Sequence, residues 1–199
     1  MPRCPVVSRP FYIHPPDQVA RALLGKVLVR RCEGEWLSGR IVETEAYFGL
    51  DDEAAHAFAG KTRRNAVLFG PPGFAYVYFI YGMHYCLNIS CEPEGEAGCV
   101  LLRALEPLEG FATMARLRGV EPDANPRLLA SGPGRLCQAL GITRDMHNGV
   151  DVTHNHSGLH VENDGFVADG ITVLPRVGIR KAADRPLRFA LQGNSFVSG

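Results

Sequence analysis

The sequence lacks several features that mark other classes of protein. It contains no run of about 18 apolar residues, which a membrane-spanning helix would need. The residues after Met1 form no apolar stretch of signal-peptide length, and the six cysteines form no Cys-x-x-Cys pair. We therefore expect an intracellular protein whose cysteines are free thiols, because reducing compartments disfavour disulfides.

An excess of charge of either sign is also missing. The 21 Lys and Arg residues balance the 21 Asp and Glu residues, so the total gives no sign of a nucleic-acid-binding protein. The distribution is uneven, because residues 41–60 carry five acids and no Lys or Arg, whereas residues 171–199 carry five bases and one acid. Phosphate binding depends on local potential rather than on net charge. A nucleic-acid enzyme and a protein with two ordinary solvated surfaces both fit this pattern.

Length and pattern predict one α+β domain. A chain of 199 residues with 46% hydrophobic and 21% charged residues is typical of one globular unit, so we expect residues 1–199 to form a single domain. β-prone runs favour a mostly antiparallel sheet with surrounding helices. The runs at 76–80 and 85–90 flank an aromatic tip and predict a protruding β-hairpin. Further strands are expected at 26–30, 39–47, 100–105, 171–174, 177–179 and 187–191, helices at 17–24, 53–58, 110–118 and 133–140, and a long loop over 48–74.

The predicted strand at 39–47 carries a pair of acidic residues. Strand alternation places Glu43, Glu45 and Tyr47 on one face. Two carboxylates that share a face can divide acid and base roles, because like-charge proximity and burial favour protonation of at least one of them. A polar strand face in water gives the same pattern, so the spacing alone leaves both interpretations open.

Four tyrosines lie within ten residues of one another around the predicted hairpin: Tyr76, Tyr78, Tyr81 and Tyr85. Flat amphipathic rings around a cleft suit a planar ligand such as a nucleobase. An aromatic side chain at a hairpin tip can also enter between stacked bases. Ordinary cross-strand aromatic packing is the alternative interpretation.

Two further segments carry cationic side chains. Arg103 interrupts an apolar strand, where a buried guanidinium requires an acidic or phosphate partner. A structural ion pair with a nearby Glu satisfies this requirement as well as a phosphate does. Arg135 follows the Ser-Gly-Pro-Gly segment at 131–134 and opens a predicted helix, whose backbone N–H groups could help to bind a phosphate.

A cluster of histidines raises the alternative of a zinc site. His154, His156 and His160 follow Asp151 closely, but their segment is turn-like and matches no established ligand pattern. We therefore expect no metal and no other cofactor, and a solvated loop at this position.

Several segments, in order along the chain, have a common resemblance. They are Glu-Thr-Glu-Ala-Tyr at 43–47, Asp-Glu-Ala-Ala-His at 52–56, Tyr-Val-Tyr at 76–78 with Tyr-Gly-Met at 81–83, and Leu-Leu-Arg-Ala-Leu-Glu-Pro at 101–107. Together with Gly-Pro at 132–133, the run at 136–140 and Pro-Leu-Arg-Phe at 186–189, they make residues 10–197 similar to the alkyladenine (3-methyladenine) DNA glycosylase family. One departure is His84, where animal members have an aromatic residue.

The resemblance implies a role for each of seven residues, and the glycine-rich loop at 131–134 indicates one for an eighth. In that family an everted purine is held in an aromatic pocket while a carboxylate activates water, and a tyrosine fills the gap left in the duplex. The implied roles are general base for Glu45, base pocket for Tyr47, His56, Tyr78 and Asn88, intercalation for Tyr81, and phosphate contact for Arg103, to which the glycine-rich loop adds Arg135.

The resemblance also implies the reaction and the partner. We expect a monomeric glycosylase of base excision repair that hydrolyses the N-glycosidic bond of alkylated purines, and of hypoxanthine or etheno-adenine, in double-stranded DNA. Because the residues of the proposed pocket include no Lys nucleophile, we expect it to be monofunctional and to leave the strand intact. Its location is then DNA-associated, in the cytoplasm or nucleoid of a bacterial cell, with no membrane partner. Two other functions remain to be tested: a nucleic-acid-binding module that releases no base, and a metal-dependent nucleoside hydrolase centred on His154, His156 and His160.

Overall fold

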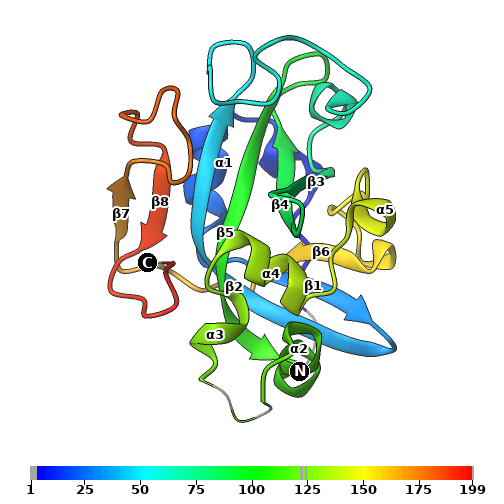
Figure 1. The fold of residues 1–199 in the computed structure, drawn as a ribbon. Coiled ribbons are helices and arrows are strands. Elements are labelled where there is room, and N and C mark those ends of the chain that lie inside the picture. The colour runs from blue at the N-terminus through cyan, green and yellow to red at the C-terminus, as the bar shows by residue number, and fades with distance from the viewer. Residues whose placement is uncertain (1–3, 122, 124, 199) are drawn as a thin grey trace.

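The computed structural model describes residues 4–121, 123 and 125–198. Over these residues the chain forms an eight-stranded antiparallel sheet with helices packed against it, which confirms the predicted α+β class (Figure 1). The strands are β1 (Val27–Cys32), β2 (Glu35–Phe48), β3 (Ala75–Ile80), β4 (His84–Cys91), β5 (Gly98–Glu109), β6 (Leu159–Glu162), β7 (Ile171–Leu174) and β8 (Arg188–Leu191). The α-helices are α1 (Pro16–Leu23), α2 (Phe111–Arg118), α3 (Arg127–Ala130), α4 (Pro133–Ala139) and α5 (Arg144–His147), and short 3-10 helices span Arg9–Tyr12, Ala66–Phe69 and Asn155–Ser157.

The long strand β2 connects two branches of the sheet. The main path runs β3-β4-β5-β2-β1-β6, and β3 and β4 form the predicted hairpin. The first part of β2 pairs with β1, whereas Glu43, Thr44 and Glu45 pair with β8, which in turn pairs with β7. Glu45 is therefore flanked by β5 on one side and β8 on the other.

Both faces of β2 are covered at its centre. Residues 41–46 are all fully buried, and Thr44 Oγ1 donates a hydrogen bond of 3.0 Å to the carbonyl of Ala20 in α1. Figure 1 shows α1 behind the long strands and α4 in front of them, and Leu23 of α1 and Leu136 of α4 both belong to the core. Burying each such leucine stabilises the fold by about 1.5–3 kcal/mol. Because side chains alternate along a strand, the acidic residues of β2 lie on the face opposite α1.

An irregularity in the pairing of β2 with β5 falls beside these acidic residues. Glu43 pairs with Ala104 and Thr44 with Leu102, so Arg103 has no direct partner in the register. A bulge of this kind bends the strand and redirects a side chain, and such bulges are common next to active sites. Here it allows Arg103 to reach both Glu43 and Glu45.

Some local predictions were wrong. Residues 177–179 form no strand, since Gly178 has a φ of 78° that extended backbone does not adopt. Residues 53–58 form successive turns rather than a helix. Helix α1 begins at Pro16, one residue before the predicted start at residue 17.

Besides the 3-10 helices, three short elements were not predicted. They are β6 and the four-residue helices α3 and α5. The strand β6 alternates apolar residues with His160 and Glu162, which are buried as well, so its sequence gives no hydrophobic run. No helix in the described part of the chain is long and apolar enough to span a membrane.

Candidate active site

A cavity of about 640 Å³ opens beside strands β3, β4 and β5. Its wall comes from segments far apart in the sequence: β2, the loop after it, the β3–β4 hairpin, β5, residues 131–135 and residues 177–179. Of the eight predicted site residues, all except Glu45 line it: Tyr47, His56, Tyr78, Tyr81, Asn88, Arg103 and Arg135. The fold thus gathers on one surface seven residues that lie between positions 47 and 135 of the chain.

Glu45 lies directly behind this wall and is fully buried. Tyr47 donates its hydroxyl hydrogen to Oε2 over 2.7 Å, and the backbone N–H of Val177 donates to Oε1 over 2.8 Å. Arg103 Nη1 lies 3.2 Å from Oε1. All three donors line the cavity. A carboxylate offers about four lone-pair positions, so three donors leave about one position for a further donor such as water.

Glu43, the other acidic residue of the pair, is held in a different way. Its Oε1 accepts from Arg103 Nε over 3.1 Å and from Arg188 Nη1 over 2.9 Å, and its Oε2 accepts from the backbone N–H of Ser198 over 2.8 Å. Of these three donors only Arg103 lines the cavity, whereas all three donors to Glu45 do. The two carboxylates therefore differ in environment, and Arg103 has the acidic partners that its position in an apolar strand requires.

His56, Tyr76 and Tyr78 form an aromatic wall. The Nδ1 atom of His56 lies 2.9 Å from the hydroxyl of Tyr76, and the ring centroids of His56 and Tyr78 are 4.4 Å apart. Burial, aided by the charge of Arg64, lowers the pKa of His56, and burial raises the pKa of Tyr76 to about 12. The phenol therefore keeps its proton at neutral pH, and a neutral His56 can accept it at Nδ1 while carrying a hydrogen on Nε2.

Asn88 is fixed at the base of the cavity by two partners. Its Nδ2 atom donates to the carbonyl of Tyr76 over 3.2 Å, and the thiol of Cys99 lies 3.8 Å from its Oδ1. Burial raises the pKa of Cys99 to about 12, so the thiol keeps its hydrogen and serves as the donor. Because a carbonyl can only accept, these contacts determine which way the amide faces.

Tyr81 lies at the tip of the hairpin in a strained conformation. Its φ is 54° and that of Gly82 is 69°, and the left-handed region raises the energy of a non-glycine residue by about 1–2 kcal/mol. The side chain is 73% exposed and forms part of the cavity mouth. Residues held in this region cluster at functional sites.

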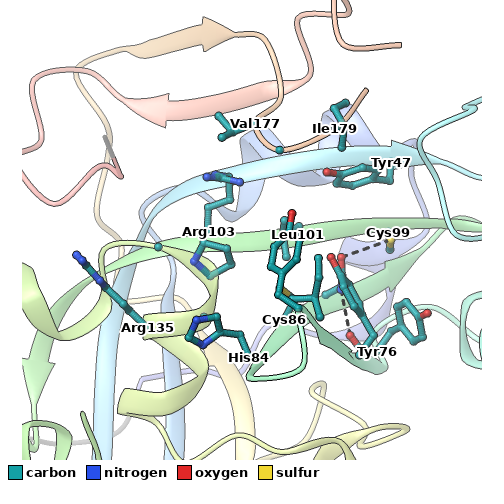
Figure 2. A pocket seen from close by; sticks show the side chains of 18 of the residues that line it. Tyr47, Tyr76, His84, Cys86, Cys99, Leu101, Arg103, Arg135, Val177 and Ile179 are labelled. Carbon is teal, nitrogen blue, oxygen red and sulfur yellow. Dashed lines mark hydrogen bonds between the residues drawn. The ribbon is translucent and has the colours of Figure 1, made fainter. Parts of the chain in front are cut away.

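The cavity has a basic end and a tyrosine-rich end. Figure 2 shows Arg103, Arg135 and His84 toward one side, and Tyr47, Tyr76 and Cys99 toward the other. Arg135 is exposed at the start of α4, and Arg118 also lines this end. A planar group and a phosphate could therefore occupy the same cavity at different ends.

The three histidines considered for zinc do not form one cluster, and the expected solvated loop holds for His154 and His156 but is wrong for His160, which lies in β6. His160 is fully buried and lies 3.0 Å from Glu162, whereas His154 and His156 stack on each other with ring centroids 5.1 Å apart and are exposed. The described residues contain no group of three or more His, Cys, Asp or Glu side chains placed to hold a metal ion.

The sequence did not identify the segment around residues 176–179 as part of a site. Val177, Gly178 and Ile179 line the cavity, and the Val177 N–H group binds Glu45. A backbone donor leaves no trace in residue type, so no signal could have found it. The neighbouring Arg176 is an isolated cation in an apolar stretch, as Arg103 is, and could have been found by the same reasoning.

These features together describe an enzyme site: a buried carboxylate is held by donors on the wall of an aromatic cavity with arginines at its rim. Residues 10–195 match the family model described as Methylpurine-DNA glycosylase (MPG). The chain belongs to this family, which confirms the resemblance found in the sequence. It is a DNA glycosylase, a hydrolase connected with DNA repair.

Bacterial relatives agree with this assignment. The chain is 58% identical over 193 residues to a protein of Koribacter versatilis, with 97% of this chain and 93% of the relative covered. It is 48% identical to a protein of Rhodopseudomonas palustris, covering 98% and 91%, and 44% identical to one of Alkaliphilus oremlandii, covering 96% and 98%. Each of the three bears the name "Putative 3-methyladenine DNA glycosylase".

Proposed function

We propose that this enzyme is a monofunctional glycosylase that removes alkylated purines of the 3-methyladenine type, and also hypoxanthine or etheno-adenine, from double-stranded DNA. We propose further that it acts as a monomer on an everted base. The observation that supports this most directly is the position of Glu45: three donors on the wall of an aromatic cavity hold its carboxylate directly behind that wall.

The aromatic end of the cavity suits the everted base. Tyr47 and Tyr78 offer flat rings to a purine, and His56 offers a hydrogen on Nε2 to an acceptor on its edge. Asn88, with its amide direction fixed, contributes to the choice of lesion. Aromatic stacking contributes about 1–3 kcal/mol per base, which offsets part of the few kcal/mol needed to take a base out of the duplex.

Glu45 supplies the chemical step. Water bound at the remaining lone-pair position transfers a proton to the carboxylate while its oxygen forms a bond to C1′ of the deoxyribose. The bond between C1′ and the purine nitrogen breaks, and its electron pair leaves with the base. Alkylation at N3 or N7 makes the purine cationic, so this electron pair neutralises it and the base leaves readily. A neutral hypoxanthine needs a proton to leave, so its excision should be slower and more sensitive to pH.

The remaining residues position the duplex. Tyr81, projecting from the hairpin tip, fills the gap left by the base, and Arg103 and Arg135 contact phosphates at the basic end. The described residues that line the cavity include no lysine, which an amine nucleophile would require. We therefore propose that the product is an abasic site in an intact strand.

The test is excision from duplexes that contain one N3- or N7-alkylated purine or one hypoxanthine, with EDTA present. Wild type should release the base, and the strand should break only after alkali. Glu45→Gln should bind the lesion duplex and release no base. Glu162→Gln is the matched control, because it neutralises another buried carboxylate, on strand β6 away from the cavity, and it should excise at the wild-type rate.

Four outcomes would contradict the proposal. Lesion binding without release of a base by wild type would indicate a binding module. Activity that EDTA abolishes, or that survives in Glu45→Gln, would indicate a different catalytic group. Strand breaks without alkali would indicate an amine nucleophile.

A further inference from the structure

A buried ion pair lies behind the cavity wall and is not explained by the roles assigned above. Arg176 and Asp52 have side chains that are both 0% exposed, and they form a two-pronged contact in which Nη2 donates to Oδ1 over 2.8 Å. Neither residue lines the cavity. The guanidinium carbon lies 4.6 Å from the centroid of the Tyr47 ring, so the pair supports a residue of the wall from behind.

Asp52 organises the loop that connects Tyr47 with His56. Its carboxylate accepts hydrogen bonds from the backbone N–H groups of Phe48 and Ala54, each over 3.2 Å. Burial by itself raises the pKa of Asp52, but the hydrogen bonds and charge of Arg176 lower it below its ordinary value. The carboxylate therefore stays charged, and the loop that carries His56 stays tied to the end of β2.

Arg176 ties this loop to two further segments. Its Nη1 donates to the carbonyl of Ala46 in β2 over 3.0 Å, and its Nη2 donates to the carbonyl of Ala182 over 3.3 Å. The next residue, Val177, donates its N–H to Glu45 over 2.8 Å. One guanidinium thus joins the strand that carries Glu45, the loop that carries His56 and the segment that supplies a donor to Glu45.

Stability alone does not account for such a pair. A buried ion pair contributes little compared with well-packed apolar side chains of similar volume, because two charges must be taken out of water. The pair does, however, determine geometry, since a guanidinium and a carboxylate bind in a planar two-pronged arrangement. Geometry matters most where a misplacement of about 1 Å can slow a reaction about a hundredfold.

We infer that Asp52 and Arg176 form a positioning pair for hydrolysis, which holds the ring of Tyr47 and the N–H group of Val177 in place on the carboxylate of Glu45. This inference rests on the proposed function. The pair acts through residues of the wall and touches neither the base nor the phosphates. Its loss should therefore slow the release of the base and leave the affinity for lesion DNA nearly unchanged.

The experiment compares Asp52→Asn, Arg176→Gln and the double variant with wild type. The rate of base release is measured under single turnover with saturating enzyme, the Kd for a lesion duplex by titration, and the midpoint of thermal unfolding in parallel. Each single variant should release the base roughly 10 to 100 times more slowly, with a Kd within about threefold of wild type. The double variant should be no slower than the slower single variant, because both substitutions remove the same contact.

Two further variants separate positioning from a general loss of stability. Glu162→Gln also neutralises a buried carboxylate and should keep the wild-type rate even if it lowers the unfolding midpoint. Arg176→Lys keeps the charge but loses the two-pronged geometry, so it should be slow although folded. It also provides the test if the neutral variants do not fold.

Wild-type rates in the folded variants would overturn the inference, and so would a rise in Kd that accounts for the whole loss of activity. A failure of the proposed function looks different, because in that case wild type releases no base or Glu45→Gln remains active.

Discussion

The hydroxyl of Tyr47 lies 2.7 Å from Oε2 of Glu45 and donates a hydrogen bond to it. The two residues are neighbours on one face of β2, so the contact arises within a single strand. Tyr47 therefore has two parts with separable roles, a ring on the wall of the cavity and a hydroxyl on the carboxylate behind it. Burial, together with the charge of Glu45, raises the pKa of Tyr47, so the phenol remains a donor at neutral pH.

Tyr47→Phe separates these two roles. The ring remains for stacking, so the Kd for lesion DNA should stay within about threefold of wild type. A hydrogen bond to a charged group contributes about 1.5–3 kcal/mol, so the single-turnover rate should fall by at least roughly tenfold. Tyr47→Leu removes both parts and should weaken binding as well. An equal loss of binding in the two variants would show that the hydroxyl acts in binding rather than on Glu45.

His56 should set an acid limit for activity. Burial, aided by Arg64, lowers its pKa below the ordinary value of 6.5. Because the folded state takes up the proton less readily than the unfolded state, the stability due to neutral His56 is fully present above pH 6.5 and is lost as the pH falls through the lowered value. Excision of an alkylated purine should decline over the same range, since protonation removes the acceptor for the hydroxyl of Tyr76.

The measurement is the single-turnover rate against pH for wild type, His56→Gln and His147→Gln. His56→Gln should be slower, and the part of the acid decline due to His56 should be missing from its profile. Burial also lowers the pKa of His147, but this residue does not line the cavity. His147→Gln should therefore change the dependence of stability on pH without changing that of excision. If the rate of His56→Gln declines at acid pH in the same way as that of wild type, the decline is due to another group.

Tyr81 should show opposite effects on activity and stability. Its φ of 54° strains a tyrosine more than an asparagine, so Tyr81→Asn should leave the free energy of unfolding unchanged or raise it by up to about 1 kcal/mol. Excision from a fully paired duplex should become slower, because nothing then fills the gap left by the base. Excision of the same lesion opposite a mismatched base should be less affected, since less energy is needed to flip it. Equal losses of activity on both substrates would count against a role for Tyr81 in filling the gap.

Arg135 and Arg103 should respond differently to substitution. Arg135 is exposed at the basic end of the cavity, so Arg135→Gln should leave stability unchanged and reduce the slope of log K against log salt by about 0.9. Arg103 pairs with two buried carboxylates, and Arg103→Gln should destabilise the fold by about 3–5 kcal/mol.

Arg116→Gln is the control for the measurements of stability and of the salt dependence of binding. Arg116 is exposed, pairs with Glu33 and does not line the cavity. Its loss should change the salt slope less than the loss of Arg135 does, and a larger change would place the DNA elsewhere.

Local patterns gave much of the fold because they depend on neighbours in the chain. The faces of β2 follow from side chains two residues apart. The hairpin of β3 and β4 and the burial of β5 follow from β-prone and apolar runs. Alternation also placed Glu43, Glu45 and Tyr47 on one face, and the contacts of Glu45 with Tyr47 agree with it. The prediction of a strand at 177–179 was wrong because these residues form a bend that lines the cavity. Gly178 adopts a positive φ in this bend, which extended backbone does not.

By itself the sequence determined the α+β class, the strand that carries Glu45 and, through the motifs at 43–47, 52–56 and 101–107, the family. Only the tertiary structure decided which carboxylate takes its donors from the cavity wall, since Glu43 and Glu45 differ by the partners that β5, β8 and the C-terminal segment bring to them. It also brought Arg176 onto Asp52, 124 residues away. The physical reason is that hydrogen bonds and ion pairs act over a few ångströms in space, and a distance along the chain does not specify them.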